Sequence, residues 1–407
     1  MTLTVEQQDF AGAVRDFCAR ECATREQREA LLDPDEEDQS SALYKKLAEL
    51  GWLGVAIPEE YGGSGGTYVD QTILFEELWR GLAPVKALGP TTTVAGCYKR
   101  FGSEEQKREA LSAIANGEIM SISISEPGAG SDVAAITCSA KAVDDGYVIN
   151  GQKTWCSYAH RAGRIVLVAR TSRDGKPHAG LTIFEVPRDA EGIETRRIST
   201  LGGREVNDVF FTDCFVPDQN VVGEIGRGFP QIMAGLDGER LLGAAVGLGI
   251  GQRALDDTVA YVKERKQFGK AIGTFQALRH RIADLATELE CARLLTYEVA
   301  ERLERGADPV TTRMTSMAKI KTSEVAKRIA LEGMQMMGGY GYATEYDMES
   351  HVRHSLVLPI YAGSNEIQRE IISGSLGLRC PRALAGAHIQ RNLRRQDGPG
   401  RDVQLAV

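Results

Sequence analysis

The sequence lacks several features that define large classes of proteins. It has 8 cysteines in 407 residues but no C-x-x-C pair, which argues against a zinc ribbon or a thioredoxin-like redox motif. Cys18 and Cys22 lie one helical turn apart without a neighbouring histidine, so free thiols are the favoured interpretation over metal ligands or disulfides. No G-x-x-x-x-G-K-[ST] segment is present, which excludes a Walker phosphate-binding loop.

Basic runs and long apolar runs are also missing. The net charge is -8 without a long basic segment, which argues against a nucleic-acid partner. No run of about 18 apolar residues could cross a membrane. The first residues, "MTLTVEQQDF", combine neither a basic nor an apolar segment, so we expect no export signal and a cytoplasmic location.

The composition that is present, 43% hydrophobic and 26% charged, is typical of a globular protein with a sizeable core. Hydrophobic residues recur at helical spacing up to about residue 117, for example at Phe10, Val14 and Phe17. Helical spacing returns from about residue 229 to about 376. We therefore expect helical segments at both ends of the chain.

Between these helical parts the period changes to two. In "MSISIS" (120–125), Met120, Ile122 and Ile124 would face one side of a strand and the serines the other. Further strands should follow to about residue 218, with "DDG" (144–146) and "NG" (150–151) as hairpin turns. The predicted fold class is α+β, with an N-terminal helical domain (1–118), a middle antiparallel β domain (119–226) and a C-terminal four-helix bundle (227–380). The polar tail (381–407) is expected to be mobile.

Glycine-rich segments raise alternatives that the residues alone leave open. "SEPGAGSDV" (125–133) suits an anion or polar ring, or is an ordinary turn. "QKTWCSYA" (152–159) places an aromatic side chain in the β section, and "QMMGGYGYATEY" (335–346) breaks a helix. "GLGIGQRA" (247–254) resembles a dinucleotide fingerprint, but it follows a helical pattern, so its glycines are expected to permit close helix packing.

The segment "LPIYAGSNEIQRE" (358–370) predicts a tight turn that leads into a helix. Ala362 and Gly363 allow the backbone to approach a ligand closely. Ser364 and Asn365 suit a helix N-terminus. The turn has the shape of a site rim, yet it contains no acid, base or nucleophile.

Together, "ISEPGAGSDV", "KTWCS", "ERKQFGKAIGTFQ", "QMMGGYGY" and "PIYAGSNEIQRE" make the chain resemble the acyl-CoA dehydrogenase family over residues 4–380. The resemblance implies a homotetramer that binds FAD between the β domain and the bundle. It also implies α,β-dehydrogenation of an acyl-CoA thioester, with electrons passed to an electron-transferring flavoprotein. The absence of a βαβ unit argues against an NAD-type enzyme.

The resemblance also assigns roles to residues of the site. Those expected to contact FAD, some of them from a neighbouring subunit, are Ser125, Gly130, Ser131, Trp155, Ser157, Arg265, Phe268, Gln276, Gln335, Gly339, Ser364 and Glu366. Those expected to contact the substrate are Ser131, Asp237, Arg240, Tyr361 and Gly363. For Ser364 and Glu366, capping of a helix is a sufficient alternative explanation.

The lack of an acidic residue at position 362 indicates which branch of the family the chain resembles. Most members have a catalytic glutamate at the position of Ala362, whereas the branch similar to the isovaleryl and long-chain enzymes carries it on a bundle helix. The matching residue is Glu239, which would remove the α-proton while the Ala362 N–H donates to the thioester oxygen. A solvent-exposed or salt-bridged glutamate is the alternative for Glu239.

Other expectations concern the substrate and two departures from the family pattern. Small residues in "GPTTTVAGCY" (89–98) are expected to line the acyl pocket and to leave room for a medium, long or branched chain. Ser350 and His354 stand where relatives have lysine and aspartate, and a solvated surface histidine is the favoured interpretation of His354 over one that alters the pH behaviour of the site. The alternative functions are an oxidase or monooxygenase, a dehydrogenase of carrier-protein-bound acyl groups, and a non-catalytic FAD- or CoA-binding subunit.

Overall fold

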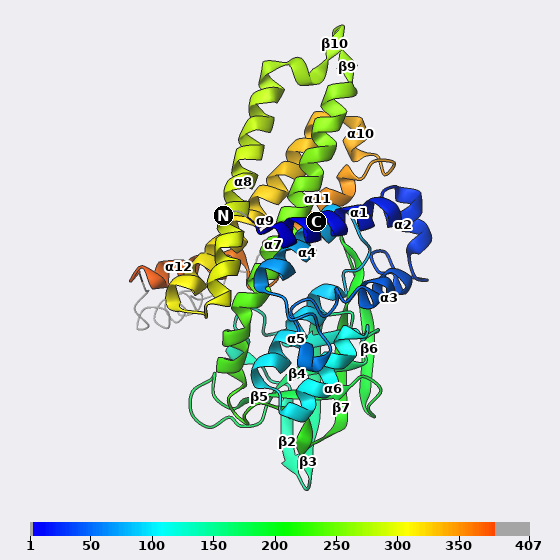
Figure 1. Cartoon of the computed structure of the whole chain (residues 1–407). Coiled ribbons are helices and arrows are strands. Elements are labelled where there is room, and N and C mark those ends of the chain that lie inside the picture. The colour runs from blue at the N-terminus through cyan, green and yellow to red at the C-terminus, as the bar shows by residue number, and fades with distance from the viewer. Residues whose placement is uncertain (1–2, 379–407) are drawn as a thin grey trace, which may run out of the picture.

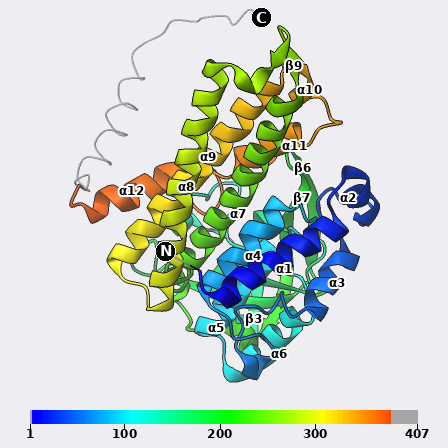
Figure 2. The same ribbon diagram turned by 45° about the horizontal axis from the view of Figure 1, so that its top comes forward.

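The computed structural model describes residues 3–378, and the predicted tail (381–407) lies outside the described residues. Helices form the N-terminal part as expected: α1 (Val5–Glu21), α2 (Arg25–Leu31), α3 (Ser41–Glu49), α4 (Tyr68–Arg80), α5 (Leu88–Phe101) and α6 (Glu104–Ala115). Of the residues at helical spacing, Val14, Phe17, Leu43 and Leu47 are buried, whereas Phe10 is half-buried and Leu50 is exposed. Helix α1 crosses α4, which places α4 between α1 and the long helix α7 (Figure 2).

The middle of the chain forms a sheet. Its strands are β1 (Met120–Ser123), β2 (Ser139–Val143), β3 (Gly146–Ser157), β4 (Arg164–Arg170), β5 (Leu181–Pro187), β6 (Ile193–Thr200), β7 (Gly203–Pro217) and β8 (Val221–Val222). The order in the described sheet is β6-β7-β3-β2-β4-β5-β8, and β1 pairs with β4. Most neighbours are antiparallel, but β1 runs parallel to β4 and β2 meets β4 in a short parallel contact.

Two expectations about the strands had different outcomes. "DDG" does form a hairpin turn, because Val143 and Gly146 pair across the β2–β3 connection. The prediction of a turn at "NG" is wrong, because both residues lie inside β3, where the register against β7 shifts at a bulge. Gly151 has a φ of +148° and passes so close to the start of β2 that a Cβ would lie 2.7 Å from the Cα of Cys138, the residue before that strand. The glycine therefore permits a close approach of two strands.

The serines of β1 are buried, although alternation predicted a polar face. Ser121 donates to the Ser157 carbonyl at 2.8 Å, and the Ser123 hydroxyl lies 3.0 Å from Cys156 Sγ. Strand β1 is packed against α5 and against β3. Hydrogen bonds across these contacts satisfy the hydroxyl groups that burial removes from water.

The C-terminal part forms a helical bundle: α7 (Gly228–Glu264), α8 (Gln276–Glu304), α9 (Pro309–Met337), α10 (Gly339–Tyr342), α11 (Met348–Val357) and α12 (Asn365–Ser375). A small hairpin, β9 (Lys266–Gln267) and β10 (Lys270–Ala271), joins α7 to α8 at the far end of the bundle (Figure 1). Single 3-10 turns lie at η1 (Glu59–Tyr61), η2 (Val133–Ala135), η3 (Asp218–Asn220) and η4 (Ile272–Thr274). Figure 1 shows that α7 starts beside the sheet and runs through the bundle to this hairpin.

The glycines of "GLGIGQRA" lie within α7 and allow close helix packing, as predicted. A Cβ at Gly247 would lie 3.2 Å from Thr322 of α9. At Gly249 it would lie 2.4 Å from the Glu76 carbonyl oxygen of α4, nearer than any real Cβ approaches. Helix α7 thus touches the backbone of α4 on one side and packs against α9 on the other.

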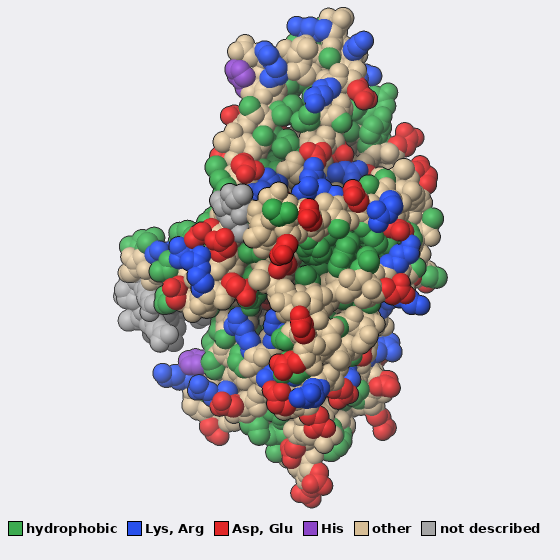
Figure 3. Space-filling view, in the orientation of Figure 1, with side chains coloured by type: hydrophobic (Ala, Val, Ile, Leu, Met, Phe, Trp, Pro, Cys, Tyr) green, Lys and Arg blue, Asp and Glu red, His purple; other side chains and the backbone are tan. Residues whose placement is uncertain are grey.

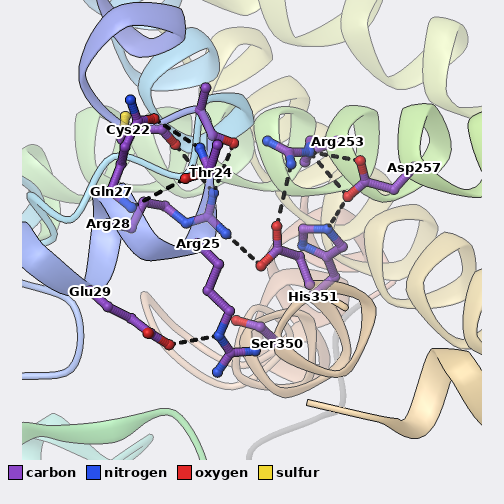
Figure 4. A network of polar contacts seen from close by, with 12 residues as sticks. Cys22, Thr24, Arg25, Gln27, Arg28, Glu29, Arg253, Asp257, Ser350 and His351 are labelled. Atoms are coloured by element: carbon purple, nitrogen blue, oxygen red, sulfur yellow. Dashed lines mark hydrogen bonds and ion pairs between the residues drawn. The ribbon is translucent and has the colours of Figure 1, made fainter. Parts of the chain in front are cut away.

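A polar network joins the N-terminal helices to the bundle (Figure 4). Arg28 of α2 pairs with Asp347 at 2.5 Å, and Arg253 of α7 bonds to Asp257 at 2.9 Å and Asp347 at 3.4 Å. His351 of α11 lies 2.8 Å from Asp257. These charges lie between three elements that are distant in sequence and fix α2 against α7 and α11.

The prediction of a solvated surface histidine at position 354 is wrong. The His354 side chain is 16% exposed, with Nε2 lying 2.7 Å from Lys86 Nζ and 3.4 Å from Asp38. Ser350 lies 3.2 Å from its Nδ1. Burial and the Lys86 ammonium lower the pKa of His354, so the imidazole is neutral at neutral pH.

The surface mixes both signs of charge, since acidic and basic side chains are interspersed on the face in Figure 3. Within residues 3–378, no helix is both long and apolar enough to span a membrane.

The contact at Gly249 gives a prediction about stability. Gly249→Ala should lower the free energy of unfolding by about 1–3 kcal/mol, because the added methyl group forces α7 away from α4. Gly12→Ala in α1 is the control: its methyl group would meet nothing within 4 Å, and better helix propensity should stabilise the protein by up to about 1 kcal/mol. Denaturant unfolding measures both, and equal stability of the two variants would contradict the packing argument.

Candidate active site

Helix α7 brings Glu239 to the acid-free turn. Gly243, one helical turn after Glu239, would place a Cβ 3.5 Å from Tyr361. Burial raises the pKa of Tyr361, and the nearby Glu239 carboxylate raises it further. The helix position and the turn, more than a hundred residues apart in sequence, therefore belong to one site.

Glu239 is not the solvated or salt-bridged glutamate of the alternative interpretation. Within the described residues, no ion pair involves its carboxylate, and it lines a cavity of about 40 Å³. Burial raises the pKa of Glu239, although the charges of Arg240 and Lys319 act in the opposite direction. A carboxylate with a raised pKa in a cavity has the properties of a general base.

The cavity beside Glu239 lies where small residues predicted an acyl pocket. Thr92, Thr93, Ala95 and Gly96 of α5 line one wall. The other lining residues come from the segment before η1 and from α4, α5 and α7: Leu53, Ala56, Ile57, Tyr68, Gln71, Lys99, Arg100, Gly235, Gly238 and Leu242. At about 40 Å³ the cavity holds only a few water-sized groups, so it does not itself supply the room expected for a long chain.

The turn is held by contacts to its carbonyl groups. Ala362 and Gly363 both have left-handed backbone angles, with φ of +54° and +78°. Lys319 Nζ donates to the Gly363 carbonyl and to Asn365 Oδ1, each at 3.0 Å. Gln368 Nε2 donates to the carbonyls of Ala362 and Gly363 at 3.2 and 2.9 Å. The turn therefore keeps a conformation that non-glycine residues rarely adopt.

These contacts leave the Ala362 N–H available. Within residues 3–378 it donates no hydrogen bond. A backbone donor that is oriented by a fixed turn and has no internal partner can bind a carbonyl oxygen of a ligand.

Ser364 and Glu366 have structural roles at the start of α12. Ser364 is the N-cap, since its hydroxyl accepts from the Ile367 N–H at 3.5 Å. Glu366 is exposed in the first turn, where backbone N–H groups and Ser364 lower its pKa. Capping thus explains both residues without a ligand, as the alternative interpretation allowed.

Asp237 and Arg240, predicted to contact the substrate, are buried and bonded to each other. Arg240 Nη1 donates to Asp237 Oδ1 at 3.1 Å, and Thr312 of α9 donates to Asp237 Oδ2 at 2.6 Å. Arg240 Nε is buried without a hydrogen-bond partner in the described chain. The Thr312 bond fixes the pair on α7 against α9, and the buried Nε of Arg240 keeps an unused donor.

On the β side, a buried ion pair organises the "SEPGAGSDV" loop. Lys153 Nζ donates to Glu126 Oε1 at 2.8 Å and to the Ile124 carbonyl at 2.9 Å. Glu126 also accepts from the N–H groups of Thr137 and Cys138, each at 2.8 Å. These bonds join the loop to β3, the strand that carries Trp155 and Ser157.

The loop and Trp155 present an open surface. The register of β3 shifts between Lys153 and Cys156, where Trp155 has a φ of +61° and is 60% exposed. Ser157 and Ser125 are half-buried, and Ser131 is exposed. A Cβ at Gly128 or Gly130 would meet no atom within 4 Å. An exposed aromatic ring beside free loop amides fits the flat, polar ring system of a flavin.

The remaining predicted residues lie at the opposite end of the molecule. Arg265 and Gly339 line a second cavity, of about 710 Å³, with residues such as Tyr340. Phe268 in the β9–β10 hairpin is 92% exposed. The other two, Gln276 at the start of α8 and Gln335 near the end of α9, lie outside the lining.

Sequence reasoning missed the buried cations. Lys319 and Lys153 lie in segments whose patterns predict an ordinary helix and strand, and their partners Asn365 and Glu126 are 46 and 27 residues away. The only available signal was a lysine at an otherwise inward-facing position. A lysine is rarely buried without a specific partner.

Three family models match successive parts of the chain. The acyl-CoA dehydrogenase N-terminal domain matches residues 4–118, the middle domain residues 121–214 and the C-terminal domain residues 226–377.

Several characterised relatives are similar over nearly the full chain. The caffeyl-CoA reductase–Etf complex subunit CarC of Acetobacterium woodii is 36% identical, covering 89% of this chain and 96% of the relative. The mitochondrial isovaleryl-CoA dehydrogenase of Solanum tuberosum is 34% identical, covering 91% and 90%. The solved structure of butyryl-CoA dehydrogenase from Megasphaera elsdenii superposes with a TM-score of 0.86 at 32% identity, covering 93% of this chain and all of that one.

The Lys153–Glu126 pair gives a prediction about stability and pH. Glu126→Gln keeps the shape but leaves a buried ammonium unpaired, so it should lower the free energy of unfolding by about 3–5 kcal/mol. Burial acts to raise the pKa of Glu126, but Lys153 and the two backbone N–H groups lower it below 4.5 overall. The stability from this carboxylate is therefore present above pH 4.5 and is lost as the pH falls through the lowered pKa.

Denaturant unfolding at pH values above and below 4.5 measures this effect. The wild type should lose more stability than Glu126→Gln on acidification. Glu191→Gln, at an exposed position, is the matched control and should follow the wild type. Equal stability of Glu126→Gln and wild type at pH 7 would contradict the role of the pair.

Proposed function

Because the chain belongs to the acyl-CoA dehydrogenase family, we propose that Glu239 is its catalytic base and that the branch of the family is the one with the acid on a bundle helix. The family is one of FAD-dependent oxidoreductases that act on CH–CH bonds, and FAD is its cofactor. The observation that carries the proposal is the half-buried Glu239, which forms no ion pair in the described chain, beside a turn whose Ala362 N–H donates no hydrogen bond within residues 3–378.

In the proposed reaction the Glu239 carboxylate removes the α-proton of an acyl-CoA thioester. The Ala362 N–H donates to the thioester oxygen, where negative charge develops, an interaction worth about 2.7–4 kcal/mol for one such donor. Lys319 acts as a positioning residue because its bonds hold the turn at the required angle. FAD, when bound, accepts the β-hydride, and the product is the 2-enoyl thioester.

The β-domain residues are proposed to hold the flavin ring. Trp155 and Ser157 would lie against it, with the Gly128–Ser131 loop and Ser125 around its edge, and Ser131 also near the thioester. The open loop and the outward Trp155 support this placement. Tyr361, Gly363, Asp237 and Arg240 would surround the CoA thioester, with Arg240 Nε as the free donor.

We also propose that two chains share each FAD. Glu239 and Arg265 are 26 residues apart on α7, a separation of about 39 Å at 1.5 Å per residue. Arg265, Phe268, Gln276, Gln335 and Gly339 would hold the adenosine-diphosphate part of the cofactor bound to a neighbouring subunit of a homotetramer. Phe268 in the β9–β10 hairpin is 92% exposed, and a large apolar side chain that is so exposed favours contact with a protein partner.

The electron acceptor and the cellular location are the remaining parts of the proposal. An electron-transferring flavoprotein is the proposed acceptor, because the similar CarC is a subunit of an Etf complex. The cytoplasmic location stays a prediction. The proposed domain division is 1–118, 119–226 and 227–380.

Glu239→Gln gives the direct test of the base. It keeps the shape of the side chain and removes its basicity, so bound flavin should be reduced by acyl-CoA at least about a hundredfold more slowly. In the wild type the rate should fall as the pH drops through the raised pKa of Glu239, because only the carboxylate accepts a proton.

Anaerobic rapid mixing, followed by flavin bleaching, measures these rates. Glu105→Gln, on the exposed side of α6, is the control and should react at the wild-type rate. A Glu239→Gln protein that reacts as fast as the wild type would exclude Glu239 as the base.

Arg265→Glu tests the shared cofactor. It should release FAD and weaken the tetramer, because a cation that pairs with pyrophosphate becomes a repelling anion. Lys263→Glu makes the same charge change at an exposed position two residues earlier and should retain both. Flavin content and sedimentation measure the outcome, and a monomeric Arg265→Glu protein with full FAD would contradict the arrangement.

A further inference from the structure

One end of the cavity beside Glu239 is basic. Its lining includes Lys99 and Arg100 from the last turn of α5, together with the polar side chains of Tyr68 and Gln71 from α4. Glu239 is the single carboxylate among the lining residues. A cavity that bound only a hydrocarbon chain would have no need of two cations.

Lys99 is half-buried and retains unused hydrogen-bond capacity. Its Nζ donates to the Ala56 carbonyl at 2.6 Å and lies 5.9 Å from the centre of the Tyr68 ring. Within residues 3–378 Lys99 forms no direct ion pair, although the Glu304 carboxylate, which accepts from the Tyr68 N–H, is near enough to raise its pKa. An ammonium has three donors, so Lys99 can still bind an anion.

Arg100 lies beside Lys99 on the same cavity. Its Nη1 donates to the Ala234 carbonyl of α7, and its Nη2 donates to the Tyr68 hydroxyl at 3.4 Å. It too forms no ion pair with a carboxylate in the part of the chain that the structure describes. Burial lowers the pKa of Lys99 and the Arg100 charge adds to this effect, while the Glu304 carboxylate acts in the opposite direction. A bound carboxylate would stabilise the charged form of Lys99 against both its burial and the repulsion from Arg100.

Helix capping alone does not explain these residues. Basic side chains in a last turn favour the carbonyl end of a helix dipole, but that interaction is available at the surface. Lys99 instead extends to Ala56, across the cavity, and Arg100 to α7. Both cations thus line the same space as Glu239, Lys99 from a half-buried position and Arg100 from the solvent-exposed edge.

The spacing along α7 separates the basic end from the reacting end. Gly243 contacts Tyr361, Glu239 follows one turn back, and Ala234, which Arg100 contacts, lies five residues further in the same direction. At 1.5 Å per residue, Ala234 is about 7.5 Å from Glu239 along the helix. Carbon–carbon bonds of about 1.5 Å cover that distance in a short chain.

We propose that the basic end of the cavity binds a carboxylate at the far end of the acyl chain, so that the substrate class is the CoA monothioester of a short dicarboxylic acid. This inference rests on the proposed function, since it places the α-carbon at Glu239. The distal carboxylate then accepts hydrogen bonds from Lys99 and Arg100, with the Tyr68 hydroxyl and Gln71 beside them.

Binding measured in the Glu239→Gln background tests the inference without turnover. The probes are the CoA thioesters of succinic, glutaric and adipic acids, each paired with the unsubstituted thioester of equal carbon number, butanoyl-, pentanoyl- or hexanoyl-CoA. By calorimetry, at least one dicarboxylic thioester should bind about tenfold more tightly than its partner, the effect of one charge-assisted hydrogen bond.

Adding Lys99→Met should remove that preference while binding of the unsubstituted thioester is retained. Arg100→Met, at an exposed position, should reduce it as well and serves if Lys99→Met does not fold. Lys141→Met, on exposed β2, is the matched control and should keep the preference. Tighter binding of the unsubstituted thioesters, or a preference that survives both variants, would overturn the inference.

The wild-type enzyme separates this result from the proposed function. Bleaching of the flavin by unsubstituted thioesters, without a binding preference for carboxylates, would overturn the inference alone. Failure of every thioester in both groups to bleach the flavin would overturn the proposed function and the inference together.

Discussion

The close packing of α7 against α4 and α9 is the constraint on which the site depends. Gly249 lets the helix touch the α4 backbone, and Gly247 lets it approach Thr322 of α9. Because α7 is 37 residues long, a displacement at these contacts would move every group it carries. The same helix carries Glu239 to the turn at Ala362. It ends at Glu264, and Arg265 is its C-cap. Larger side chains at the glycine positions would displace the helix, and with it the groups that the site needs in fixed positions.

Buried charges perform the local part of the positioning. Lys319 holds the turn through carbonyl groups, Lys153 holds the glycine-rich loop through Glu126, and Arg240 is fixed by Asp237. Each of these ions is largely removed from water, so its hydrogen bonds are costly to break. Loops rich in glycine lose more conformational entropy on folding than other segments. The ion contacts offset that loss where the site needs a single conformation.

Sequence periodicity predicted the helices, the change to strands and the close glycine packing, because each depends on residues near one another in the chain. The parallel pairing of β1 was not predicted, since strand direction depends on where a distant strand lies. "NG" was predicted as a turn because the dipeptide favours one, but pairing of β3 with β7 made it a bulge. Glu239 and Ala362 could be linked through the family resemblance alone. No spacing rule joins positions 123 residues apart, and none joins Lys319 to Gly363 or His354 to Lys86.

The strength of Glu239 as a base follows from what its neighbours already bind. Arg240 is the adjacent cation, but its charge is balanced by Asp237, which Thr312 holds in place. Lys319 is the other nearby cation, and its ammonium donates to Gly363 and Asn365 instead of to Glu239. Both cations lower the pKa of Glu239 less than burial raises it. If either bonded directly to Glu239, the carboxylate would be stabilised and would lose proton affinity. The bonds that fix the turn and α7 thus also keep both cations from neutralising the base.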